Sequence, residues 1–223
     1  MASALTPHGV IETLADLLIQ LGDISPERVR FRPLPGTATE QDVLDVQAHE
    51  GRLCELVDGV LVEKGVGFRE SFLAMVLSTV LWDFVKSRHL GLVTGADGMM
   101  RLVSGLVRIP DAAFMSWDRL PGRRMPSDPI PNVAPDLVVE VLSESNTAAE
   151  MARKRQEYFS AGVRLAWFVD PVTRTVDVYT AVDQSTVLQA EDTLEGGAVL
   201  PGFTLWLREF FDQLDHQGND VET

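Results

Sequence analysis

The chain has 223 residues, of which 33 are acidic and 19 are Lys or Arg, and its formal net charge is −14 at pH 7. This length fits one sizeable domain or two small ones, and 45% hydrophobic residues are enough to form a core. The single cysteine, Cys54, excludes an internal disulfide framework, and the sequence lacks the Cys/His pairs that hold structural zinc. The acidic charge opposes nonspecific binding to nucleic acid, because that affinity comes largely from counterions that Lys and Arg release.

The N-terminal sequence has no basic segment ahead of an apolar one, so it does not resemble a secretory signal. The most apolar long stretch, residues 71–85, is too short to cross a bilayer. We therefore expect a soluble cytoplasmic protein with no membrane partner. Acidic residues are concentrated near the end of the chain, and we expect residues 211–223 to form an acidic C-terminal tail.

In chain order, the first predicted element is a helix over residues 9–21, where apolar side chains recur at helical spacing. We assign it to an N-terminal helical extension, residues 1–38, ahead of a main domain over residues 39–210. Thr39 can cap a second short helix, since Asp42 follows three residues later. Two apolar runs then flank Asp58-Gly59, which is the strongest short signal for a β-hairpin.

An amphipathic helix is predicted over residues 69–88, followed by short strands separated by glycine-rich turns. Residues 136–142 form a nearly continuous valine-rich run, typical of a strand that is covered on both faces. A helix over residues 147–161 and a second buried strand over 164–169 follow, which predicts a parallel pair joined by a right-handed crossover. Together these elements predict an α/β (α+β) domain with a mixed central β-sheet flanked by helices.

Glu140 is unusual because it lies inside the valine-rich strand, where a carboxylate is costly to bury unless it is paired, protonated or bound to a metal. Asp136 lies about 13 Å away along the same strand, too far to share one metal ion. Asp111, which follows Pro110 at the edge of another apolar run, is the best partner. Each of the two residues has a structural alternative. Glu140 could lie at the end of the sheet and reach solvent or an arginine. Asp111 could belong to an ordinary Pro-Asp turn.

Lys154, one of three lysines in the chain, lies on the helix directly after the Glu140 strand. Its structural alternative is an exposed helical pair with Glu150. Two carboxylates and a lysine form a recognisable chemical set, because carboxylates bind hard cations such as Mg²⁺ and such a cation activates water and stabilises charge on a phosphate. The lysine can orient that water or neutralise the oxyanion.

Pro110-Asp111, the segment Glu140-Val141-Leu142-Ser143 and Lys154 together resemble the PD-(D/E)xK nuclease pattern. More narrowly, about residues 39–179 resemble the Uma-two family of proposed endonucleases. That resemblance implies a restriction-endonuclease-like fold with an N-terminal β-hairpin. In the plain motif the lysine stands two residues after the acid, where this chain has Leu142, so the resemblance implies that Lys154 on the following helix takes its place.

Glu55 in the first hairpin is a fourth candidate, which could complete the metal shell, orient a water or pair with an arginine on a neighbouring strand. We read Asp136 as structural, accepting hydrogen bonds from backbone donors at the start of its strand. Arg119, Arg123 and Arg124 could contact phosphates, or could lie on a solvated loop.

The resemblance implies an endonuclease that uses Mg²⁺ or Mn²⁺ to hydrolyse phosphodiester bonds in nucleic acid, with DNA the expected substrate. Asp111 and Glu140 would hold the metal, and Lys154 would position the attacking water. A homodimer is compatible with this function, because cutting two strands needs two sites. Two alternatives stay open: a catalytically inactive module for protein interaction or regulation, which the charge of −14 favours, and a metal-dependent enzyme that acts on a small phosphate ester.

Overall fold

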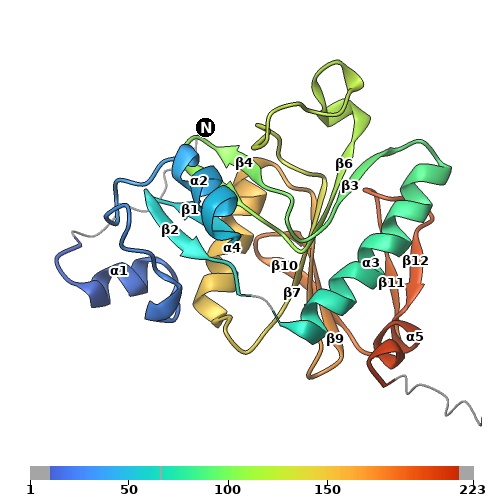
Figure 1. The fold of residues 1–223 in the computed structure, drawn as a ribbon. Coiled ribbons are helices and arrows are strands. Elements are labelled where there is room, and N and C mark those ends of the chain that lie inside the picture. Colours follow the sequence, from blue (N-terminus) through green and yellow to red (C-terminus); the bar gives the residue numbers. More distant parts are fainter. Residues whose placement is uncertain (1–10, 66, 216–223) are drawn as a thin grey trace, which may run out of the picture.

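A computed structural model describes residues 11–65 and 67–215. In this part of the chain, the main sheet has six strands in the order β10-β9-β8-β7-β6-β3 (Figure 1). Its strands are β3 (Gly91–Thr94), β6 (Ala112–Ser116), β7 (Leu137–Val141), β8 (Leu165–Asp170), β9 (Thr175–Ala181) and β10 (Gln184–Leu188). Strands β7 and β8 are parallel, whereas the other neighbours are antiparallel, so the sheet is mixed as predicted.

Strand β7, helix α4 (Ala148–Ala161) and strand β8 form the crossover that the sequence predicts. All five residues of β7 are buried, which explains its nearly continuous apolar sequence. The helix begins after Thr147, whose side-chain oxygen accepts a hydrogen bond from the Glu150 backbone N–H at 2.9 Å. It ends at Gly162, whose φ of 99° is accessible to glycine at little cost. Local signals therefore set both ends of the helix.

A second sheet, here called the hairpin sheet, has the strand order β2-β1-β5-β4 in the described residues. Its strands are β1 (Cys54–Val57), β2 (Val60–Glu63), β4 (Met100–Val103) and β5 (Leu106–Arg108). Asp58 and Gly59 join β1 to β2 with φ angles of 51° and 72°, both in the left-handed region that a tight hairpin turn requires. The predicted N-terminal β-hairpin is therefore present.

The two faces of the main sheet carry different cores because side chains alternate along each strand. The odd-numbered residues of β7 face α3 (Phe68–Ser87) and α5 (Leu207–Asp212), together with the short pair β11 (Thr193–Glu195) and β12 (Thr204–Trp206). Val138 on the same strand instead packs with Met151 and Tyr158 of α4. Glu140 therefore points toward α4, as Val138 does.

The N-terminal segment packs on the outer hairpin. Helix α1 (Leu14–Gln20) is shorter than the expected helix, and residues 9 and 10 of that prediction lie outside the described residues. Its Leu17 packs with Val57 and Val62 of the hairpin. Helix α2 (Glu40–Glu50) begins with the predicted capping box of Thr39 and Asp42.

At the other end of the chain, Phe211 of α5 is fully buried in the main core, although the acidic tail was expected to start there. Residues 216–223 of the expected tail lie outside the described residues.

Candidate active site

Helix α4 lies between the two sheets, and its Lys154 contacts a residue of each sheet. The Lys154 ammonium is 3.2 Å from each carboxylate oxygen of Glu140 on β7 and 3.2 Å from Oε1 of Glu55 on β1. All three residues are buried, with residue exposures of 1–4%. Three of the four predicted site residues therefore meet around one ammonium group.

Tyr158, one helical turn after Lys154, donates a short hydrogen bond from its hydroxyl to Oε1 of Glu140. Burial raises the pKa of Tyr158 well above its usual value, and the charge of Glu140 raises it further, so the phenol stays protonated as a donor. Burial also raises the pKa of Glu140; Lys154 opposes that rise, whereas the negative charge of Asp111 adds to it. Burial and Asp111 thus favour the neutral form of Glu140, whereas Lys154 favours its ionised form.

The pKa of Glu55 is lowered, in contrast to that of Glu140. Burial favours its neutral form, but Lys154 and Arg108 outweigh that effect and lower the pKa of Glu55 to about 2. Its Oε2 lies 2.6 Å from the Arg108 guanidinium, and its Oε1 accepts a hydrogen bond of 3.1 Å from the Ile109 backbone N–H. Glu55 thus pairs with an arginine of the adjacent strand β5, which is the structural alternative stated above, while it also contacts Lys154.

The charge of Lys154 is fixed by its surroundings. Burial alone would lower the pKa of Lys154, but Glu140 and Glu55 raise it above its ordinary value. The side chain is therefore an ammonium at neutral pH and cannot act as a general base. It can supply positive charge and hydrogen-bond donors to a neighbouring oxyanion.

Asp111 lies immediately before β6, on the same face of the main sheet as Glu140. Its backbone N–H donates to the Val139 carbonyl at 2.9 Å, and its Oδ2 accepts from the Val141 N–H at 2.6 Å. Two hydrogen bonds to the residues on either side of Glu140 therefore fix Asp111 beside it. The negative charge of Asp111 raises the pKa of Glu140, as expected for neighbouring carboxylates.

Lys64, which the sequence reasoning missed as a site residue, pairs with Asp111. Its ammonium is 2.8 Å from Oδ1 of Asp111 and donates to the carbonyl oxygens of Ala96 at 2.9 Å and Ile109 at 2.8 Å. These three contacts match the three N–H donors of an ammonium group. The scarcity of lysine in the chain and the position of Lys64 just after β2 were the available signals.

Glu150 of α4 is paired with an arginine from the N-terminal segment. Both of its oxygens accept hydrogen bonds from the Arg28 guanidinium, at 2.9 and 2.7 Å, so it is not the exposed partner of Lys154 that the helical spacing allowed. Asp136 is structural as predicted: its Oδ2 accepts from the Ser116 backbone N–H at 2.8 Å. Arg119 donates to Asp136 at 2.8 Å, which ties this arginine to the fold.

The donor set is compatible with Mg²⁺ or Mn²⁺. Among the described residues no group of three or more His, Cys, Asp and Glu side chains is placed to hold a metal, so protein ligation would rest on Asp111 and Glu140. Mg²⁺ commonly takes only one or two protein carboxylates and completes its shell with waters and substrate phosphates. Two neighbouring carboxylates attract a cation, and in this structure the ammonium groups of Lys64 and Lys154 already pair with them.

In the described residues, no helix is both long and apolar enough to cross a membrane.

A search of curated proteins gave no match. A crystal structure of a "putative nuclease belonging to DUF820" from Anabaena variabilis is similar with a TM-score of 0.65 and 19% sequence identity. The similarity covers 73% of this chain and 91% of that one, and it shows the predicted mixed α/β, nuclease-like fold. A family model described as "Putative restriction endonuclease" matches residues 40–208. The chain therefore belongs to the Uma2 (Uma-two) family.

Proposed function

We propose that this protein is a nuclease that uses Mg²⁺ or Mn²⁺ to hydrolyse phosphodiester bonds in nucleic acid, with DNA as the expected substrate. The observation that supports this most is the grouping of Asp111, Glu140 and Lys154 on one face of the main sheet. These residues are 29 and 14 positions apart in sequence, and only the fold brings them together. Membership of a family described as putative restriction endonucleases supports the same conclusion.

In this proposal Asp111 and Glu140 hold the metal. When bound, a divalent cation lowers the pKa of a coordinated water and stabilises charge that develops on phosphorus-bound oxygens. Tyr158 fixes the orientation of Glu140 through its hydroxyl group. Lys154, permanently charged between Glu55 and Glu140, orients the attacking water and neutralises negative charge on the phosphate.

Lys64 has a separate role, because it occupies the Oδ1 side of Asp111. An ammonium group and a divalent cation are attracted to the same carboxylate, so the contact with Lys64 would weaken metal binding at Asp111. Lys64 would also offer a second positive charge to a phosphate group at the edge of the site. Glu55 and Arg108 hold the other side of the site in place.

Cleavage assays with substituted proteins test the proposal. Plasmid DNA, single-stranded DNA and RNA are incubated with the protein in Mg²⁺, Mn²⁺ or EDTA. We expect cleavage only with a divalent cation, and a loss of at least about 100-fold in Asp111→Asn and Glu140→Gln, because outer-shell changes alone cost 10–100-fold at metal sites. Asp118→Asn is the control, since the side chain of Asp118 is 85% exposed. Cleavage in EDTA, or wild-type rates in both variants, would refute the proposal.

The alternative of an inactive interaction module also has an observation in its favour. The carboxylates of Asp111 and Glu140 are already neutralised by Lys64 and Lys154, and the net charge of −14 opposes binding of a phosphate backbone. Such a protein would keep its ion pairs and bind no metal. Calorimetric titration with Mn²⁺ separates the two functions, since only the nuclease proposal predicts binding that depends on Asp111.

A further inference from the structure

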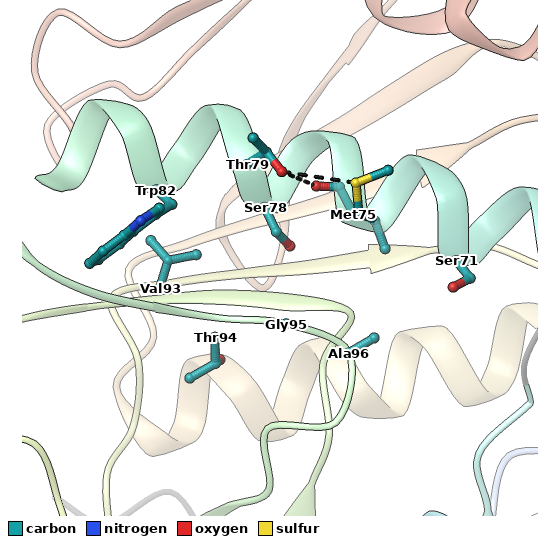
Figure 2. Close-up of a pocket in the computed structure, with 10 residues that line it drawn as sticks. Ser71, Met75, Ser78, Thr79, Trp82, Val93, Thr94, Gly95 and Ala96 are labelled. Carbon is teal, nitrogen blue, oxygen red and sulfur yellow. Dashed lines mark hydrogen bonds between the residues drawn. The ribbon is translucent and has the colours of Figure 1, made fainter.

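We infer that the hollow between helix α3 and strand β3 receives an unpaired nucleobase of the substrate, an inference that rests on the proposed nuclease function. Figure 2 shows this hollow, with Trp82 and Ser78 on the helix and Gly95 and Ala96 on the segment after β3. Its volume is about 410 Å³, within the range of small-ligand sites. No residue of the proposed metal centre lines it.

The lining of the hollow suits an aromatic ring with polar edges. Trp82 is 39% exposed and Met75 is 53% exposed, which leaves large apolar side chains open to a ligand. The Lys86 ammonium lies 5.9 Å from the centre of the Trp82 ring and adds positive charge at this end of the helix. Bases stack on aromatic side chains irrespective of sequence, because every base has a flat π-face.

Two buried hydroxyl groups in the lining of the hollow, those of Ser78 and Thr94, lack a hydrogen-bond partner among the described residues. Within the described residues the Ser78 hydroxyl has no hydrogen-bond partner, although serines inside helices often bond to a carbonyl one turn earlier. Figure 2 shows Ser78 on the side of α3 that faces the Gly95 segment. Because an unpaired buried hydroxyl is costly, a ligand with hydrogen-bonding edges would be favoured there.

Two contacts of Lys64 link the wall of the hollow to the proposed site. The side chain of Ala96 lines the hollow, and its carbonyl oxygen accepts a hydrogen bond of 2.9 Å from Lys64. The same ammonium is 2.8 Å from Asp111. Two hydrogen-bond lengths, about 6 Å at most, therefore separate the wall of the hollow from the proposed metal ligand. A base bound in the hollow would belong to a nucleotide at, or next to, the phosphate that is cleaved.

The base must be unpaired, because a base stacked in a duplex cannot enter a hollow between a helix and a strand. The protein also has a reason to rely on bases. Its net charge of −14 limits the affinity that backbone phosphates supply, so base contacts must provide a larger share. The expected substrate class is therefore single-stranded or locally unpaired nucleic acid.

Binding without metal tests this inference separately from cleavage. In EDTA and low salt, fluorescence anisotropy compares a short oligothymidylate with an abasic strand of the same length and the same number of phosphates. We expect the wild-type protein to bind the oligothymidylate roughly ten-fold or more tightly, as expected for loss of base stacking. Trp82→Ala should remove this preference. Trp206→Ala is the matched control, because Trp206 is 50% exposed and does not line the hollow.

A second variant fills the hollow without removing a side chain. A Cβ at Gly95 would meet no heavy atom within 4 Å, so Gly95→Leu should fold and occupy the space of the base. It should lose the preference for oligothymidylate as Trp82→Ala does. Equal binding of both strands by the wild type, binding of neither, or an unchanged preference in both variants would overturn the inference. If the wild-type protein shows the preference but never cleaves with Mn²⁺, the base-binding pocket is supported and the proposed nuclease function is refuted.

Discussion

Glu55→Gln should destabilise the protein strongly at neutral pH and much less in acid. The pKa of Glu55 falls from 4.5 to about 2 on folding, because Lys154 and Arg108 outweigh the effect of burial. Such a shift corresponds to about 3 kcal/mol of stability, which is a large share of a typical domain's total. A lowered carboxyl pKa stabilises the fold fully above the unfolded value, and that stability is lost as the pH falls through the folded value. The difference between wild type and variant should therefore shrink from about pH 5 toward pH 2.

Urea unfolding at a series of pH values measures this difference directly. Glu191→Gln is a suitable control, because Glu191 is 66% exposed in a surface pair with Arg208 and such pairs contribute at most about 1 kcal/mol. Equal stability of Glu55→Gln and wild type at pH 7, or a difference that grows in acid, would show that Glu55 is not an ionised partner of Lys154 and Arg108.

Three further substitutions test the rest of the site. Lys154→Met should lower the free energy of unfolding by about 3–5 kcal/mol, because it leaves Glu55 and Glu140 buried without their shared ammonium; a change below 1 kcal/mol in urea unfolding would contradict this. Tyr158→Phe should lower the free energy of unfolding by about 1.5–3 kcal/mol, because it removes a hydrogen bond to a charged group. An unchanged thermal midpoint would argue against that bond. Lys64→Gln should bind Mn²⁺ roughly ten-fold more tightly in calorimetric titration, since it removes a cation that competes for Asp111. Weaker binding would mean that Lys64 supports the metal site.

The central crossover was predictable because its signals are local. A valine-rich run, a capped helix and a second apolar run are enough to specify β7, α4 and β8. The hairpin was equally clear from Asp58-Gly59. Strand β10 was not predicted, since its residues are almost all exposed and its sequence lacks the alternation of a half-buried strand.

The proximity of Glu140 and Lys154 could be anticipated because α4 follows β7 directly and must pack back on the sheet. The pairing of Lys64 with Asp111 could not, since it depends on how the hairpin sheet meets the main sheet. Arg28 and Glu150 lie 122 positions apart, and nothing in the helical pattern of α4 shows that the N-terminal segment covers this end of the helix. Sequence reasoning thus missed the contacts that the hairpin sheet and the N-terminal segment make with the rest of the domain.

The most direct test of the account is the change in thermal midpoint on adding Mn²⁺ or Mg²⁺ to wild type, Asp111→Asn and Glu140→Gln. A ligand at 100 times its Kd stabilises a fold by about 2.7 kcal/mol, which is about 5–10 °C for a protein of this size. We predict that rise for the wild type and for Asp118→Asn, and none for the two site variants. An equal rise in all four proteins, or none in the wild type, would contradict a metal centre built on these two carboxylates.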